Sequence, residues 1–238
     1  MTTDVLPDDV LIEIFDFHLN GMSIFDDDMN DEYGMIRWHT LVHVCQRWRQ
    51  LIFTSPCRLG LVLEYNGKKP MREMLDVWPV LPIAIRLRAL ESLLKPSHAD
   101  NIVDALDLEN HARIHEIKLD EFPRSHWDRF VGAMQKPFPQ LRNLQIGCSG
   151  GATAVLPISD LFLGGSVSHL QKLRLENIQF PFPGVQKQLL TANNLVELSL
   201  WTTPLSGYIS PEAMVICLSA MPRLEILLFR VDFPRFRP

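Results

Sequence analysis

The segment Leu170-Gln171-Lys172-Leu173-Arg174-Leu175 decides the fold, because its leucines fill the first, fourth and sixth positions of a pattern that recurs along the chain. Alternation of apolar and polar residues is typical of a β-strand with one buried face. Successive copies end 25 to 29 residues apart, which predicts a repeating unit of one strand and its return connection. The other four copies begin at Ile114, Leu141, Leu195 and Leu224.

The connections between these strands carry helix signals. Ser210-Pro211-Glu212 supplies a capping side chain, a proline at the first helical position and an early acid. Strands that alternate with helices predict an α/β fold with a parallel sheet lined by helices. The predicted helices cover residues near 99–110, 126–135, 158–164, 184–192 and 211–220.

These repeats resemble leucine-rich repeats, which implies a solenoid with a curved parallel sheet and flanking helices. The resemblance is imperfect at the turn position where that family has Asn or Cys. An ordinary α/β sheet with a coincidental leucine pattern is therefore the alternative. The residues at this turn position are Phe122, Ser149, Ile178, Thr203 and Asp232.

Residues that alternate with the apolar positions should point to the opposite face of the sheet, as Glu116 and Ser199 do in the expected strands. Trp and Arg dominate many binding interfaces, so we predict that this face binds a protein substrate. Arg174 and Trp201, on neighbouring strands, should lie close together. The predicted substrate-binding residues are Lys118, Lys172, Arg174, Trp201 and Arg230.

Two amphipathic helical stretches precede the repeats. Leu6-Pro7-Asp8-Asp9 predicts a helix start, with proline in the first turn and two acids near the positive end of the helix dipole. Val10, Leu11, Ile14 and Phe15 should share one face of this helix. On a second helix the shared face comprises Leu41, Val44, Cys45, Trp48, Leu51 and Ile52. A module this small barely sustains its own core, so part of the apolar surface is predicted to belong to a partner. The alternative is that the whole stripe is intramolecular core.

The N-terminal residues look like an F-box, through Leu6-Pro7, Val10-Leu11, Ile14-Phe15, the string Val44-Cys45-Gln46-Arg47-Trp48, and Ser55-Pro56. The resemblance implies a helical module that docks on a Skp-type adaptor of a cullin-RING ubiquitin ligase. The stretch from Pro70 to Ile83 is similar to the expanded F-box families of basidiomycete fungi. The adaptor-binding residues that the resemblance implies are Leu6, Pro7, Val10, Leu11, Ile14, Phe15, Val44, Cys45, Trp48 and Leu51.

An acidic insert, Asn20 to Arg37, separates the two helical stretches where F-box proteins have a short turn. Its Asp26, Asp28 and Asn30 match the start of a calcium loop. Asp31 stands where that loop needs Gly, and Arg37 stands where it needs a bidentate Glu. We expect a solvated acidic loop, and a loop of this length could distort adaptor docking.

Composition excludes several classes of function. The net charge of −5 works against binding to nucleic acid or an anionic membrane. No apolar run approaches the roughly 18 residues of a membrane span, and the N-terminus lacks the basic residues of a secretory signal. We therefore expect an intracellular protein, cytoplasmic or nuclear, with neither nucleic acid nor membrane as a partner. The four cysteines form no Cys-x-x-Cys pair, which favours buried reduced thiols.

No motif points to catalysis. His111 and His115 have the spacing of two zinc ligands on a helix, but no Glu follows the first, and His115 falls in a predicted strand. We interpret both as surface histidines. The glycines near 147–151 and 164–165 match no phosphate-binding loop, and Gly-x-Ser-x-Gly is absent from the sequence. The sequence predicts no enzymatic activity, no cofactor and no metal site.

We predict three regions: an F-box module at 5–56, a bridging segment at 57–97, and a leucine-rich-repeat-like solenoid at 98–238. Within the bridge, Ile83, Ile85 and Leu87 match an incomplete first repeat. The predicted function is substrate recognition in a Skp-cullin-F-box ubiquitin ligase, with the F-box on the adaptor and the repeats on an unknown target protein. The alternative is an interaction scaffold whose F-box does not engage a ligase.

Overall fold

The computed structural model describes residues 6–20, 37–56, 58–76, 81–87, 96–148, 161–165, 167–176, 178, 190–203 and 210–231. The chain divides into two compact units. The helical unit comprises Met1–Glu64 with Trp78–Leu81, and the sheet unit comprises Tyr65–Val77 with Pro82–Pro238. The predicted bridging segment is thus shared between the two units. The acidic insert and its calcium-loop positions 26–31 lie outside the described residues.

The described residues of the helical unit form α1 (Asp8–Asn20), α2 (Arg37–Val42) and α3 (Gln46–Thr54). The prediction of a single second helix is wrong, because the helix is interrupted between Val42, the end of α2, and Gln46, the start of α3. Cys45 is extended there, with φ −158° and ψ 170°, and precedes the first turn of α3. The Nε of Arg49 donates to the Val42 carbonyl at 3.0 Å, which satisfies an end carbonyl of α2 and stabilises the break.

Aromatic side chains hold the helical unit together. Phe15 of α1 is fully buried and packs on Trp48 of α3, with 4.7 Å between the ring centroids. Leu11 and Ile52 are buried beside them in the core of the unit. The indole N–H of Trp38 donates to the Val62 carbonyl at 3.1 Å. Helix α1 therefore has a buried side, set by Leu11 and Phe15, and an opposite side open to solvent.

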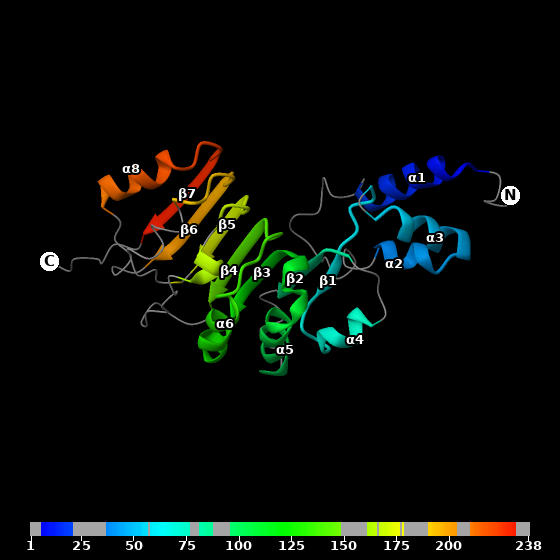
Figure 1. The fold of residues 1–238 in the computed structure, drawn as a ribbon, viewed down its shortest axis with the longest axis horizontal. Helices are drawn as coiled ribbons and strands as arrows, with labels where there is room; N and C mark the ends of the chain where they lie inside the picture. Colours follow the sequence, from blue (N-terminus) through cyan, green and yellow to red (C-terminus); the bar gives the residue numbers. More distant parts are fainter. Residues whose placement is uncertain are drawn as a thin grey trace. The chain divides into compact units, whose positions relative to one another are not determined.

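Seven strands form one sheet in sequence order, as Figure 1 shows. Strands β2 to β7 pair in parallel, which confirms the predicted α/β class with a parallel sheet. All five repeat strands and the incomplete first copy form strands, while the three-residue strand β1 was not predicted. The strands are β1 (Leu63–Tyr65), β2 (Ile83–Leu87), β3 (Ile114–Phe122), β4 (Asn143–Cys148), β5 (Lys172–Glu176), β6 (Glu197–Thr203) and β7 (Ile226–Val231).

The strand register places equivalent repeat positions side by side. Leu173 pairs with Leu144 on one neighbour and Leu198 on the other, so the apolar positions form continuous rows across the sheet. These rows are buried as far as β6. On the last strand, β7, the row members Leu227 and Phe229 are exposed. The repeat pattern thus specifies both the strand pairing and the buried face of the sheet.

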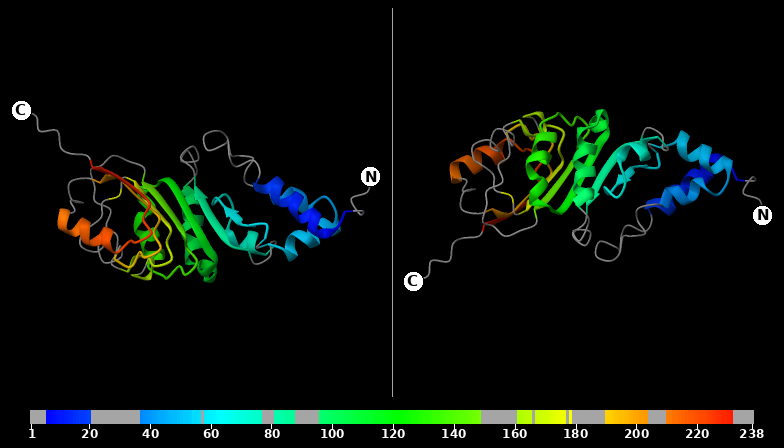
Figure 2. Two further views of the ribbon diagram at one scale, coloured as in Figure 1. Left: turned by 90° about the horizontal axis from the view of Figure 1, so that it is seen from above. Right: turned by 90° about the horizontal axis from the view of Figure 1, so that it is seen from below.

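Helices α5 (Pro96–Asp107) and α6 (Trp127–Ala133) lie beside one another on the same face of the sheet, as the two views of Figure 2 show. Phe130 of α6 packs on Phe122 of β3, with ring centroids 5.1 Å apart. Two further helices within the described ranges are the short α4 (Met71–Leu75) and α8 (Pro211–Ser219). The Ser210 hydroxyl accepts from the Ala213 N–H to cap α8.

The predicted helix near 158–164 is wrong in its described part. Residues Phe162–Gly165 form only a 3₁₀ turn, because Leu163 and Gly164 have left-handed backbone angles that cannot continue a helix. The predicted helix at 184–192 falls almost entirely outside the described residues. Within the described ranges, no helix is both long and apolar enough to cross a membrane.

Candidate docking surfaces

One side of α1 exposes a line of large apolar side chains. Leu6, Val10, Ile14 and Phe17 are 38%, 42%, 46% and 76% exposed. Val10, Ile14 and Phe17 lie in α1, where spacings of four and three residues place them on one helix face, and Leu6 precedes the helix by two residues. We call these four residues the α1 stripe. Monomeric proteins rarely leave such a contiguous apolar surface uncovered, so the stripe is suited to contact a partner.

The stripe is positioned by charged contacts between α1 and the rest of the helical unit. Arg47 of α3 donates to the Asp8 carboxylate at 2.6 Å and also to the Leu6 carbonyl, which fixes the start of α1. Arg58 donates to the Glu13 carboxylate at 2.5 Å, one turn further along. Together with the buried side chains of Leu11 and Phe15, these contacts set the rotation of α1 about its axis.

The structure divides the predicted adaptor-binding residues by exposure. Leu11 and Phe15 are buried, so we reassign them to the core that holds α1 in place. Trp48 and Leu51 are half-buried. Phe17, the most exposed member of the stripe, was missed, although its spacing from Ile14 could have revealed it. The predicted residues that are exposed are Leu6, Pro7, Val10, Ile14, Val44 and Cys45.

The cysteines differ in their environments. Cys148 and Cys217 are buried and free, as predicted, and burial raises the pKa of both thiols. The prediction is wrong for Cys45, which is free but exposed at the junction of α2 and α3. This exposure follows from the helix break, since a continuous helix would have turned Cys45 toward the same side as Trp48.

The second surface is the face of the sheet opposite α5 and α6, which carries side chains of both charges. Arg86 and Glu116 form an ion pair at 2.6 Å, and the Asn143 amide donates to the same carboxylate at 3.2 Å. Burial raises the pKa of Glu116, but the hydrogen bonds from Arg86 and Asn143 and the neighbouring positive charge, chiefly that of Arg86, together outweigh it and leave the pKa below its usual value. These contacts connect β2, β3 and β4 across the polar face.

Further along this face, Arg174 lies over the ring of Trp201, with 4.7 Å from the guanidinium carbon to the ring centroid. The predicted proximity of these two residues is confirmed. Lys118 is exposed, and Lys172 pairs with Glu197 at 3.2 Å. Ser199, predicted to be accessible, is only 1% exposed. The side chain of Arg230 lies outside the described residues, although its backbone pairs with Trp201 on the neighbouring strand.

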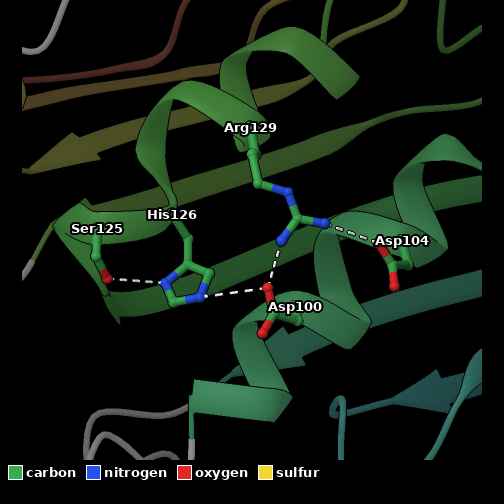
Figure 3. Close-up of polar contacts among 5 residues, drawn as sticks. All are labelled: Asp100, Asp104, Ser125, His126 and Arg129. Atoms are coloured by element: carbon green, nitrogen blue, oxygen red, sulfur yellow. Dashed lines mark hydrogen bonds and ion pairs between the residues drawn. The ribbon is translucent and has the colours of Figure 1, made fainter.

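A polar cluster between α5 and α6 brings together a hydroxyl, an imidazole and a carboxylate (Figure 3). The Ser125 hydroxyl is 2.9 Å from His126 Nδ1, and His126 Nε2 is 3.4 Å from Asp100. Arg129 binds Asp100 and also bonds Asp104 at 3.0 Å. In a catalytic triad the carboxylate would polarise the imidazole, but here Asp100 is already bound by the Arg129 guanidinium. We therefore interpret the cluster as a set of structural contacts that hold α6 against α5.

A pocket of about 470 Å³ lies against α4 and α5. Its two carboxylates, Asp104 and Asp107, are bound by Arg129 and Lys136. The nearby hydroxyl of Tyr65 donates to the Lys69 carbonyl at 2.8 Å. Burial, together with the charge of Asp104, raises the pKa of Tyr65. The two carboxylates of this pocket and the Tyr65 hydroxyl are therefore engaged in structural contacts.

The two histidines with zinc-like spacing do not share a helix face. His111 lies in a 3₁₀ turn and His115 in β3, and both are half-buried rather than on the surface. Each ring is within hydrogen-bond distance of a backbone carbonyl, that of Leu108 at 3.1 Å and that of Ile83 at 3.0 Å. In the part of the chain that the structure describes, no group of three potential ligands is placed to hold a metal ion.

Comparison of the chain with models of protein families, with curated proteins and with solved structures found no match. The candidate sites therefore stand on their own geometry, which assigns an apolar surface to the helical unit and a polar surface to the sheet.

Proposed function

We propose that this protein is the substrate-recognition subunit of a Skp-cullin-F-box ubiquitin ligase. In this proposal the α1 stripe docks on the Skp-type adaptor, and the polar face of the sheet binds the target protein. The chemistry of ubiquitin transfer belongs to other subunits of the complex.

The observation that carries the proposal is the exposure of the α1 stripe. Three of its members, Leu6, Val10 and Ile14, belong to the F-box-like residues of the sequence, and all three are more than a third exposed. Val44, from the second F-box-like string, is 56% exposed at the α2–α3 junction. An F-box needs such apolar side chains on its surface, because their burial against the adaptor supplies the affinity.

The sheet supports the second half of the proposal. Regular pairing of β2 to β7 offers a rigid platform, and binding residues placed on rigid elements hold their positions better than residues on loops. The platform carries Lys118, Lys172 and the Arg174–Trp201 pair on one face. A mixed-charge surface with an aromatic anchor suits a protein target better than a nucleic acid.

The proposal predicts that Ile14→Ser weakens binding of the full chain to a Skp-type adaptor. Loss of an apolar anchor typically costs about 2 kcal/mol or more, which is roughly 30-fold in the dissociation constant. Titration of the labelled adaptor, followed by fluorescence anisotropy, measures the change.

The matched control is Ile216→Ser on α8, which removes the same side chain at 52% exposure against 46% for Ile14. This variant should bind the adaptor as the wild type does. Equal affinities for the wild type and both variants would show that α1 is not the docking surface.

A further inference from the structure

Arg174 is held in one orientation across the polar face of the sheet. Its backbone pairs with Ser199 of β6, whereas Trp201 pairs with Glu176. The Arg174 side chain therefore extends diagonally from β5 to the neighbouring strand β6, where its guanidinium carbon lies 4.7 Å from the centroid of the Trp201 ring. A guanidinium is planar, and an aromatic ring beneath it fixes its orientation. The N–H donors at the edge of the guanidinium can then still point to an acceptor.

The donors of this guanidinium are poorly matched within the described part of the protein. Arg174 Nη2 is 3.5 Å from Glu176 Oε2, longer than the about 2.7 to 2.9 Å of a charge-assisted hydrogen bond. The Nε of Arg174 is buried without a hydrogen-bond partner among the described residues. Arg86, on the same face, instead bonds Glu116 at 2.6 Å. Arg174 is thus held in place by Trp201, but it lacks the close acceptor that Arg86 has in Glu116.

Ser199 adds a second unsatisfied donor at the same place. It is 1% exposed, and its hydroxyl has no hydrogen-bond partner in the described ranges. Because Ser199 and Arg174 are register partners, both side chains project from the same face on adjacent strands. Buried polar groups are nearly always paired, so two unpaired groups on neighbouring strands mark this place on the sheet as incompletely satisfied. Both atoms are buried, so a ligand acceptor would contact the exposed part of Arg174, whose side chain is 36% exposed.

The side chains around Arg174 carry both positive and negative charges. Lys172 lies two residues before Arg174 on the same face of β5, and Lys118 lies two strands away in the same row. Most acids nearby are already engaged: Glu116 with Arg86, Asp120 with Gln145, and Glu197 with Lys172. Gln145 is neutral and does not offset the charge of Asp120, whereas Glu176, through its long contact with Arg174, is the described acid placed to compete with an incoming anion.

We infer that Arg174, braced by Trp201 and flanked by Ser199, binds one oxyanion of the target protein. That oxyanion is either the carboxylate of an acidic side chain or the phosphoryl group of a phosphorylated residue. A guanidinium receives either group through two parallel hydrogen bonds. The adjacent indole ring then packs against apolar atoms of the same segment. The inference rests on the proposal that this face of the sheet binds the target.

A degenerate peptide library tests this inference. The full chain is incubated with fluorescent peptides in which one fixed position holds Asp, Glu, phosphoserine, or the neutral residues Asn, Gln and Ser. We expect the acidic or phosphorylated sets to bind at least about 10-fold more tightly than the neutral sets. The ratio of phosphoserine to Asp and Glu distinguishes the two sources of the oxyanion.

Arg174→Gln should abolish this preference, whereas Arg174→Lys should keep only part of it, because lysine retains the charge without the planar pair of donors. Arg223→Gln, which removes an arginine bonded to Asn194, is the matched control and should keep the full preference. Thermal unfolding of each variant verifies that it is folded. Absence of an acidic preference in the wild type, or its retention in Arg174→Gln, would overturn the inference.

Adaptor binding, measured on the same preparations, separates this inference from the proposed function. Adaptor capture without an acidic preference contradicts the oxyanion site and leaves the ligase proposal standing. An Arg174-dependent acidic preference without adaptor capture supports the oxyanion site and contradicts the ligase role.

Discussion

Gly67, in the turn after β1, shows how a single residue controls the local chain path. Its φ of +75° lies in the left-handed region, and a Cβ added there would be 2.6 Å from the His98 carbonyl oxygen. The Gly67 carbonyl accepts a hydrogen bond from the Asn101 amide at 2.9 Å. The turn is therefore packed closely against the start of α5, and only glycine satisfies both the backbone angle and the spacing.

Gly67→Ala should lower the free energy of unfolding by about 1 to 3 kcal/mol or more, since left-handed strain and a backbone clash act together. Gly132→Ala is the matched control, because Gly132 lies in α6 and nothing is within 4 Å of its added Cβ. That variant should be neutral or stabilised by up to about 1 kcal/mol. Urea denaturation measures both. Similar effects of the two substitutions would contradict the account of the turn.

Neighbouring strands are connected by polar contacts as well as by backbone pairing. Glu116 of β3 accepts from Arg86 of β2 and from Asn143 of β4. The side chain of Glu116 is only 15% exposed, so solvent screens these contacts weakly. Since its pKa is lowered in the folded state, its charged form stabilises the fold.

The stabilisation by Glu116 should be present above the unfolded-state pKa of about 4.3 and lost as the pH falls through the lower folded-state pKa. The difference in unfolding free energy between wild type and Glu116→Gln should therefore shrink between about pH 6 and about pH 3. Urea denaturation across this range measures the difference. Glu225→Gln, at an exposed position before β7, is the matched control. A difference that stays constant with pH would contradict the role given to the ion pair.

For the whole molecule, the sequence predicts the sheet better than the helical unit. Spacing of the leucine pattern predicts β2 to β7, because each repeat places apolar residues at the same two positions of its strand, and these positions are buried from β2 to β6. The proximity of Arg174 and Trp201 follows from that same register. The break at Cys45 was not predicted, because the apolar spacing continues across it, and the hydrogen bond from Arg49 to the end of α2 that accompanies the break leaves no mark in that spacing.

The sequence pattern did not separate the buried from the exposed apolar residues of α1. Leu11 and Ile14 are both apolar members of one helix, yet one is 1% exposed and the other 46%. The difference arises from the packing of Phe15 on Trp48 and from the contacts of Arg47 and Arg58 with α1. Periodicity places residues on a helix face, whereas tertiary packing determines which part of that face meets solvent.

Assignment of the two units to different partners is the central claim for the whole molecule: the helical unit binds the adaptor and the sheet binds the target. The most direct measurement is co-expression of the full chain with a Skp-type adaptor, followed by size-exclusion chromatography with light scattering. We predict a 1:1 complex for the wild type and for Arg174→Gln, and its loss on replacement of Ile14 and Phe17 together by serine. A folded wild-type chain that elutes alone, without the adaptor, would contradict the claim.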